Sequence, residues 1–273
     1  MNMLLPDQFV RVAGAKVKIV VFDISPLRED YCFSQILLCV LRDLALDTDI
    51  LIDYSDDVLN EVSLSEKRIQ DALALTDADL LVFGSYVATR SNVQPMIHLV
   101  CSYGRPMQNG SILPEGIDLG QAILEGDAIL QMPRHILLRD VLPVMAIESL
   151  SYQNSLAEDI FRIARFIQAI KLYKAEKFKE TAQLIDSILG NLGPSEEWPG
   201  YWVPFCYLHM LGGMVQLRLG DAQRAVYTLS NALTRSTPAK MRIQRIAEQV
   251  ISSLIQEETP GPAGDPEPDA EPK

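Results

Sequence analysis

Residues 211–238 constrain the fold most, because their spacing of Gly, Ala and apolar residues describes two antiparallel helices instead of one. An apolar helical face stops at Gly220 and Asp221, where Gly commonly ends a helix and Asp is a good cap for the next. In the second helix, Ala225 and Ala232 stand on one face, and their small side chains let a neighbouring helix approach closely. The segment therefore predicts a helical hairpin.

This hairpin resembles a tetratricopeptide repeat. Five residues match the spacing of that motif: Gly213, Gly220, Ala225, Leu229 and Ala232. Pro238 falls one place late, and His209 replaces the usual aromatic residue near the start of the first helix. The resemblance implies a helical array that binds another protein or peptide and carries out no reaction.

An earlier helical pair spans residues 156–175 and 177–189. Its turn at Glu176 corresponds to the turn at Gly220, 44 positions later, whereas the standard repeat has a period of ~34 residues. Thr181 stands where the repeat prefers Ala, so we interpret the first unit as degenerate.

Together the two pairs predict a helical domain over residues 155–257. Residues 238–256 carry an apolar stripe with polar residues opposite, which is typical of the capping helix at the end of a repeat array. The acidic, proline-rich residues 258–273 hold too few apolar side chains to offset the entropy of ordering, so we expect them to be disordered.

The first half of the chain alternates between strand and helix patterns. After an N-terminal extension at residues 1–15, the apolar run at 16–24 is typical of a strand that is buried on both faces. The further predicted elements are a helix at 30–46, a strand at 49–54, a helix at 64–75 and a hairpin of strands at 79–90 and 93–102. This order predicts an α/β domain over residues 16–150, with a mixed sheet covered by helices.

Two prolines modify this prediction. Pro95 cannot donate a hydrogen bond to a strand ladder, so the last strand should lie at a sheet edge or break there. Residues 134–150 are apolar enough for a buried bridging helix, which Pro143 should kink or split.

Residues 16–102 resemble the domain family named after the amino-terminal domain of TolB. The resemblance rests on KVKIVVFDI, TDILIDYS and ALALTDADLLVFGSYVATRSNVQPMIHLV, whose helix, Ala-Asp, strand, Gly-Ser and hairpin follow the order of the family. Domains of this family are often joined to tetratricopeptide repeats in bacteria. The two resemblances together imply a bacterial scaffold protein in a signalling or regulatory assembly.

Charge and cysteine usage limit the classes of partner and compartment. The formal net charge of -12 disfavours nucleic acid and anionic membranes as partners. The four cysteines show no metal-ligand spacing and lie on apolar elements, which favours buried, reduced thiols: Cys32, Cys39, Cys101 and Cys206. No basic start precedes an apolar run, and nowhere do ~18 apolar residues follow one another, so we expect a soluble cytoplasmic protein.

The sequence also supports one alternative to a protein that only binds other proteins. The common phosphate-loop, dinucleotide, zinc-protease and serine-hydrolase motifs are absent from the sequence, and we expect no enzyme, cofactor or metal site. His98, His135 and His209 are far apart in sequence, and structural roles are expected for them. Asp23 and Asp53 end predicted strands, where α/β sheets collect ligands. The alternative function is therefore a sensor or enzyme that binds a small ligand or nucleotide in a pocket near these two residues.

The tetratricopeptide resemblance also predicts a groove, because the first helix of each repeat lines the concave side of such arrays. The predicted groove residues are Phe166, Ile170, Tyr173, Lys174, Tyr207, Met210, Met214 and Arg218. Aromatic and Met anchors with two cations suit a peptide that carries an acidic group. The alternative is that residues 134–150 or 238–256 fill this groove, because two units are fewer than the ~3 usually needed for stability.

Overall fold

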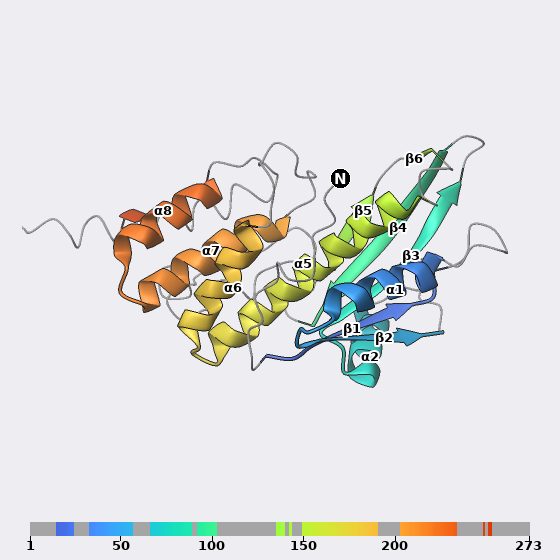
Figure 1. The fold of residues 1–273 in the computed structure, drawn as a ribbon, viewed down its shortest axis with the longest axis horizontal. Helices are drawn as coiled ribbons and strands as arrows, with labels where there is room; N and C mark the ends of the chain where they lie inside the picture. Colours follow the sequence, from blue (N-terminus) through green and yellow to red (C-terminus); the bar gives the residue numbers. More distant parts are fainter. Residues whose placement is uncertain are drawn as a thin grey trace, which may run out of the picture.

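The computed structural model describes residues 15–24, 33–56, 66–88, 92–102, 135–139, 142–143, 149–190, 203–233, 248 and 251–252. Its strands are β1 (Val17–Phe22), β2 (Ile50–Ser55), β3 (Leu80–Ala88), β4 (Asn92–Cys101), β5 (His135–Arg139) and β6 (Leu142–Pro143). Its helices are α1 (Phe33–Ala45), α2 (Glu66–Thr76), α5 (Leu150–Lys174), α6 (Phe178–Gly190), α7 (Val203–Arg218) and α8 (Ala222–Leu233). The predicted fold class is confirmed: a mixed sheet with covering helices is followed by helical hairpins (Figure 1).

The sheet has the order β2-β1-β3-β4-β5, and β6 pairs with β4 beyond the end of β5. β1 runs parallel to both β2 and β3, while β3, β4 and β5 are antiparallel to their neighbours. The predicted hairpin is present, with Ala88 opposite Val93. β4 lies inside the sheet, but its outer partner changes from β5 at Met96 to β6 at Val93. Pro95, which has no N–H, lies at this change of partner.

Residues 134–150 were predicted to be a helix, and that prediction is wrong. The structure has β5 and β6 within this range, and α5 begins only at its last residue. Periodicity alone cannot separate a short apolar strand from part of a buried helix, and here the outer edge of β4 offers strand partners. Pro143 lies in β6, which pairs with β4 through only two residues.

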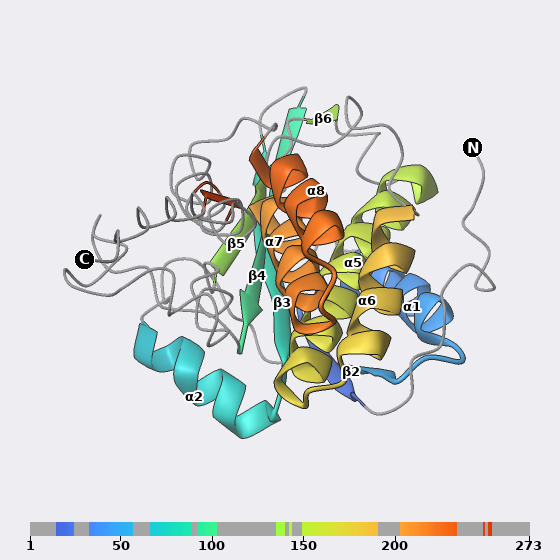
Figure 2. The ribbon, with the colours of Figure 1, turned by 90° about the vertical axis from the view of Figure 1, so that its left-hand side faces the viewer.

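Helices cover both faces of the sheet (Figure 2). Alternate residues of β1 point to opposite faces, so Ile19 and Val21 pack with α1 and α5, whereas Val20 and Phe22 pack with α2. The apolar stripes predicted for α1 and α2 account for this arrangement, and Phe33, Leu37 and Leu41 of α1 are fully buried.

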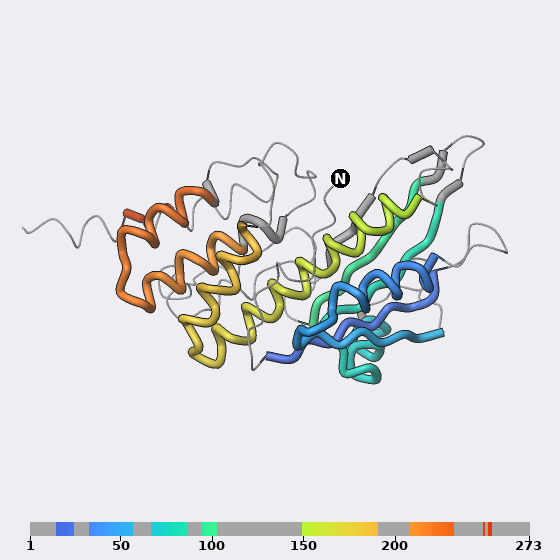
Figure 3. The backbone as a smooth tube through the Cα atoms, viewed as in Figure 1, coloured from blue at the N-terminus to red at the C-terminus, as the bar shows by residue number. Residues whose placement is uncertain are grey.

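Helix α5 connects the sheet to the helical hairpins. It contacts α1 and β1 on the sheet side and α6 and α7 on the other, and Figure 3 shows it running from one part to the next. One hydrophobic cluster contains residues of the sheet, α1, α5, α6, α7 and α8. The division predicted near residues 151–154 falls at the start of α5, and both sides of it contribute to this cluster.

The two hairpins close with the same turn. Glu176 N–H donates to Tyr173 O and Lys177 N–H to Leu172 O, while Gly220 and Asp221 repeat these two bonds 44 positions later. Both Glu176 (φ 58°) and Gly220 (φ 80°) adopt the left-handed conformation that ends a helix. The predicted cap is confirmed, because Asp221 Oδ1 accepts from Arg224 N–H at 3.0 Å. The turn predicted at Glu176 is therefore equivalent in geometry to the one at Gly220.

Several predictions fall outside the described residues. They concern the extension before Ala15, the tail at 258–273 and most of the capping helix at 238–256. Within the capping segment, Glu248, Ile251 and Ser252 are helical, and Ile251 packs against the cluster that contains α5 and α7.

Candidate functional site

The two predicted ligand carboxylates lie on opposite faces of the sheet. Ile19 and Val21 of β1 and Ile52 and Tyr54 of β2 face α1, so Asp23 continues the α1 side and Asp53 points to the α2 side. Asp53 is opposite Val20 in the strand register, three residues before Asp23. The pocket expected between these carboxylates is not formed.

Hydrogen bonds between Asp23, Ile24 and Ser34 connect the end of β1 to the start of α1. Ser34 Oγ–H donates to Asp23 Oδ1 at 2.7 Å, and Ser34 Oγ accepts from Ile24 N–H at 3.0 Å. Ser34 is buried, so these bonds satisfy a hydroxyl that has left water. Burial raises the pKa of the neighbouring Tyr54 phenol, and the negative charge of Asp23 raises it further.

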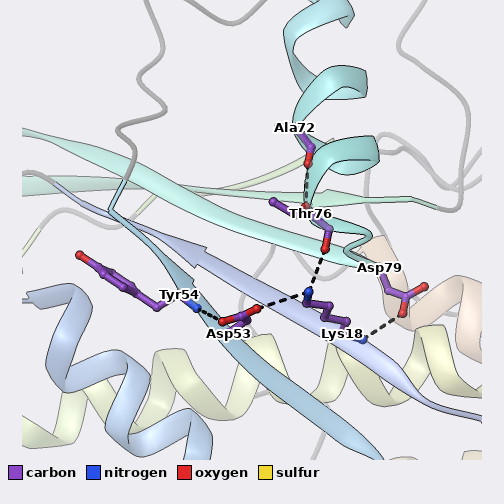
Figure 4. A network of polar contacts seen from close by, with 6 residues as sticks. All are labelled: Lys18, Asp53, Tyr54, Ala72, Thr76 and Asp79. Atoms are coloured by element: carbon purple, nitrogen blue, oxygen red, sulfur yellow. Dashed lines mark hydrogen bonds and ion pairs between the residues drawn. The ribbon is translucent and has the colours of Figure 1, made fainter.

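Asp53 belongs instead to a polar network on the α2 face (Figure 4). Its carboxylate accepts the backbone N–H of Tyr54 at 2.9 Å and lies 3.3 Å from Lys18 Nζ. These two contacts lower the pKa of Asp53, and the N–H of Tyr54 contributes most. Lys18 Nζ–H also donates to Thr76 O at 2.9 Å, where the end of α2 favours a cation.

Asp79 joins this network to α5. Its Oδ2 accepts Lys18 N–H at 2.9 Å and Lys171 Nζ–H at 2.7 Å. Lys171 donates to Lys16 O as well, and Gln168 donates to Ala15 O one turn earlier in α5. Two side chains of α5, Lys171 and Gln168, thus tie this helix to the residues that precede β1 and β3. Sequence reasoning missed the network because it searched only the carboxyl ends of the strands.

The same network borders a cavity of about 580 Å³. It lies at the amino ends of β1 and β3, and its lining includes Lys16, Lys18, Asp79 and Lys171. Leu51 and Leu73 supply apolar wall on one side. This cavity combines charged and apolar groups, as small-molecule sites do.

The structure places most of the predicted groove residues in the hydrophobic core. Phe166, Ile170, Tyr173, Met210 and Met214 are each at most 8% exposed. They do not form a surface that a partner peptide can reach, so the prediction of an open groove at these positions is wrong. The segment predicted as the alternative filler contributes Ile251 to the cluster that encloses them.

The remaining predicted groove residues differ from these five. Lys174 and Arg218 are exposed at the ends of α5 and α7. The side chain of Tyr207 lies outside the described residues. A signal for the burial was present in the sequence, because apolar residues occur on every side of α5 and α7, as in helices that are buried all round.

A narrow cleft opens on the outer side of the hairpins, between α6 and α8. It has a volume of about 130 Å³, and Gly212 of α7 is among its lining residues. Ile185 and Leu189 of α6 form an apolar wall of the cleft. Tyr227 of α8 also lines the cleft, and this residue is 70% exposed. Arg224 pairs with Asp186 across the two helices at 2.9 Å.

The other predicted functional residues have structural surroundings. His98 is buried and stacks on Phe83 with ring centroids 5.0 Å apart, and His209 is buried in α7. His135 was expected on a helix but lies in β5. Cys101 is buried as expected, whereas Cys39 is exposed because it lies on the outer side of α1.

The described ranges contain neither a metal-binding cluster nor a membrane-spanning helix. No group of three or more His, Cys, Asp or Glu side chains is placed there to hold a metal ion. Nor does any helix in those ranges have the length and apolar character needed to cross a bilayer.

The fold and these sites define the class of the molecule: a mixed α/β sheet continued through a shared helix into two helical hairpins. Comparison of the chain with protein-family models gives no match, and comparison with curated proteins gives none either.

Proposed function

We propose that this chain is a non-enzymatic protein-interaction module, which presents the outer side of its helical hairpins to a partner. The observation that carries the proposal is the repeated geometry of the hairpins: both first helices end in the same pair of backbone hydrogen bonds, 44 positions apart. Repeated helical hairpins build extended surfaces that bind proteins. The resemblances to tetratricopeptide repeats and to the TolB amino-terminal domain family are part of this proposal.

The contact surface differs from the groove predicted from the sequence, because the residues of that groove are buried. We define the outer hairpin surface by four residues that line the cleft between α6 and α8: Asp186, Arg224, Tyr227 and Asn231. Exposed tyrosines are frequent anchors at protein interfaces, since they offer large contact area at low entropic cost. The apolar wall of the cleft fits one apolar side chain of the partner.

Exposed cations extend this surface at one end of the hairpins. The turns after α5 and α7 lie at the same end of the array (Figure 1). Lys174 and Arg218 are the last residues of these two helices, and both are exposed. Exposed cations of this kind can pair with an acidic group on a partner. The proposal therefore favours a partner segment with an acidic group, in a cytoplasmic regulatory or signalling assembly of a bacterial cell.

The test is affinity capture from lysate of the native cell with matched variants. Tyr227→Ser should lose the specific partner, because removal of an interface anchor costs about 2 kcal/mol or more, which is roughly 30-fold in affinity. Lys67→Glu changes an exposed residue of α2 on the other part of the molecule, and it should keep the partner. Circular dichroism confirms that both variants are folded.

A second pair of variants tests the acidic group. Charge reversal of Lys174 and Arg218 together should weaken capture, with an effect that shrinks at high salt. If Tyr227→Ser, the charge reversal and Lys67→Glu all capture the same proteins as the unmodified chain, the outer hairpin surface is not the binding surface and the proposal fails.

A further inference from the structure

The cavity at the amino ends of β1 and β3 reverses the charge balance of the chain. The whole sequence has 36 acidic and 24 basic residues, whereas the lining of the cavity has three lysines and two aspartates. The lysines come from β1, the residue before it and α5, so the fold gathers them from distant parts of the sequence. Within the lining the lysines outnumber the carboxylates by one, and Asp53 lies beside Lys18 just outside it, so what the cavity offers an anion is a set of converging N–H donors.

Two of the three ammonium groups are held in fixed positions. Lys18 Nζ donates to Thr76 O and lies beside Asp53, while Lys171 Nζ donates to Asp79 and to Lys16 O. An ammonium has three N–H donors. Lys18 and Lys171 each have two partners in the structure, which leaves one N–H of each for an anion. Preorganised donors of this kind bind an anion without the entropic cost of ordering a flexible side chain.

The third ammonium is more open. Lys16 is exposed, and the structure records no bond from its Nζ to any described residue. Its backbone carbonyl, by contrast, is fixed by Lys171 at 2.6 Å. Lys16 therefore has a positioned backbone and an uncommitted charge at the cavity.

Apolar side chains form the other part of the lining. Leu51 on the edge strand β2 is 54% exposed, and Leu73 and Ala74 of α2 line the same cavity. We propose that this cavity binds a small organic anion, with its carboxylate or phosphate held by Lys16, Lys18 and Lys171 and its apolar body against Leu51 and Leu73.

The test uses three aromatic probes and the intact, 15N-labelled chain. Phenyl phosphate and benzoate carry the two anionic groups, and phenol is the neutral counterpart. Titration with at least one anion should give saturable shifts of the backbone amide signals of Lys16, Lys18, Asp79 and Ser102, which border the cavity. The anion that binds more tightly identifies the preferred group, and phenol should leave these signals unchanged.

Matched variants locate the binding. Lys16→Gln should weaken the tighter anion roughly fivefold, the size of one exposed charge contact. Lys179→Gln, an exposed lysine of α6 outside the cavity lining, should bind as the unmodified chain does. The proposal is overturned if neither anion shifts the cavity amides, if phenol shifts them equally, or if Lys16→Gln and Lys179→Gln have the same affinity.

Discussion

In the first helical hairpin α5 is enclosed by α1, β1, α6 and α7, whereas in the second hairpin α8 has an exposed outer face. The polar residues of the two hairpins follow this difference. Gln153, Asp159, Arg165 and Gln168 of α5 are all buried, and burial lowers the pKa of Arg165 to about 10. In α8, Gln223, Arg224 and Tyr227 are exposed. Two units with equivalent turns therefore have different surroundings: α5 is enclosed between the sheet and the other helices, whereas α8 keeps an exposed face.

The two sides of the hairpins differ in what they leave exposed to a proposed partner. The inner side of the hairpins is occupied by the core that the first hairpin shares with the sheet. On the helical hairpins, the cleft between α6 and α8 combines exposed side chains with a hollow. The proposed contact surface and the core therefore lie on different sides of the hairpins.

The largest effect is expected from a charge placed on the inner side. Met214→Lys should lower the free energy of unfolding by more than about 3 kcal/mol, because Met214 is 3% exposed and an isolated buried charge is costly. Arg218→Glu, one turn later in α7 and exposed, should lower it by only about 1 kcal/mol, because it places an anion where the helix end favours a cation. Urea unfolding followed by circular dichroism measures both. Equal stability of the two variants would contradict the burial of Met214 and support an open groove on this side of α7.

A smaller effect is expected where α7 and α8 touch. A Cβ at Gly213 would lie 2.5 Å from Leu229 Cγ, whereas a Cβ at Gly190 would meet no atom within 4 Å. Gly213→Ala should therefore destabilise the protein by about 1–3 kcal/mol through overpacking. Gly190→Ala provides the control and should not destabilise it. A Gly213→Ala variant as stable as the control would show that α8 is not packed against α7 as described.

The two turns give the smallest predicted effects, and these have opposite signs. Glu176→Gly should stabilise the protein by about 1 kcal/mol, because Gly adopts a positive φ without the penalty of a side chain. Gly220→Ala should destabilise it by a similar amount for the same reason. Thermal unfolding of both variants checks the equivalence of the turns, which is contradicted if both changes shift the melting temperature in the same direction.

Sequence patterns predicted most of the elements, because each has a clear local signal. The stripe through Leu37 and Leu41 predicted a helix on the sheet, and the Gly220-Asp221 pair predicted the turn that the structure contains. The strand at residues 135–139 was missed because its partner is the outer edge of β4, which is distant in sequence. Local periodicity carries no information about such a partner.

The candidate sites were harder to predict than the elements. Both carboxylates were expected at strand ends, but only Asp23 follows its strand, whereas Asp53 lies within β2, two residues before its end. The pleat also sends them to opposite faces, and that depends on the register of β1 and β2. Lys171 reaches Asp79 although 92 positions separate them. Contacts of this kind arise only when α5 packs on the sheet. The all-round apolar pattern of α5 was the one local sign that its inner side belongs to a core.

The central claim is that α5 belongs to one hydrophobic core together with the sheet and α7. Hydrogen–deuterium exchange at increasing urea measures this directly, by mass spectrometry of peptides that cover β1 and residues 208–215 of α7. The account predicts that both peptides lose protection at the same urea concentration, and that Phe161→Ala in α5 lowers that concentration equally for both. Loss of protection in α7 at lower urea than in β1, with Phe161→Ala affecting only one of them, would contradict a shared core.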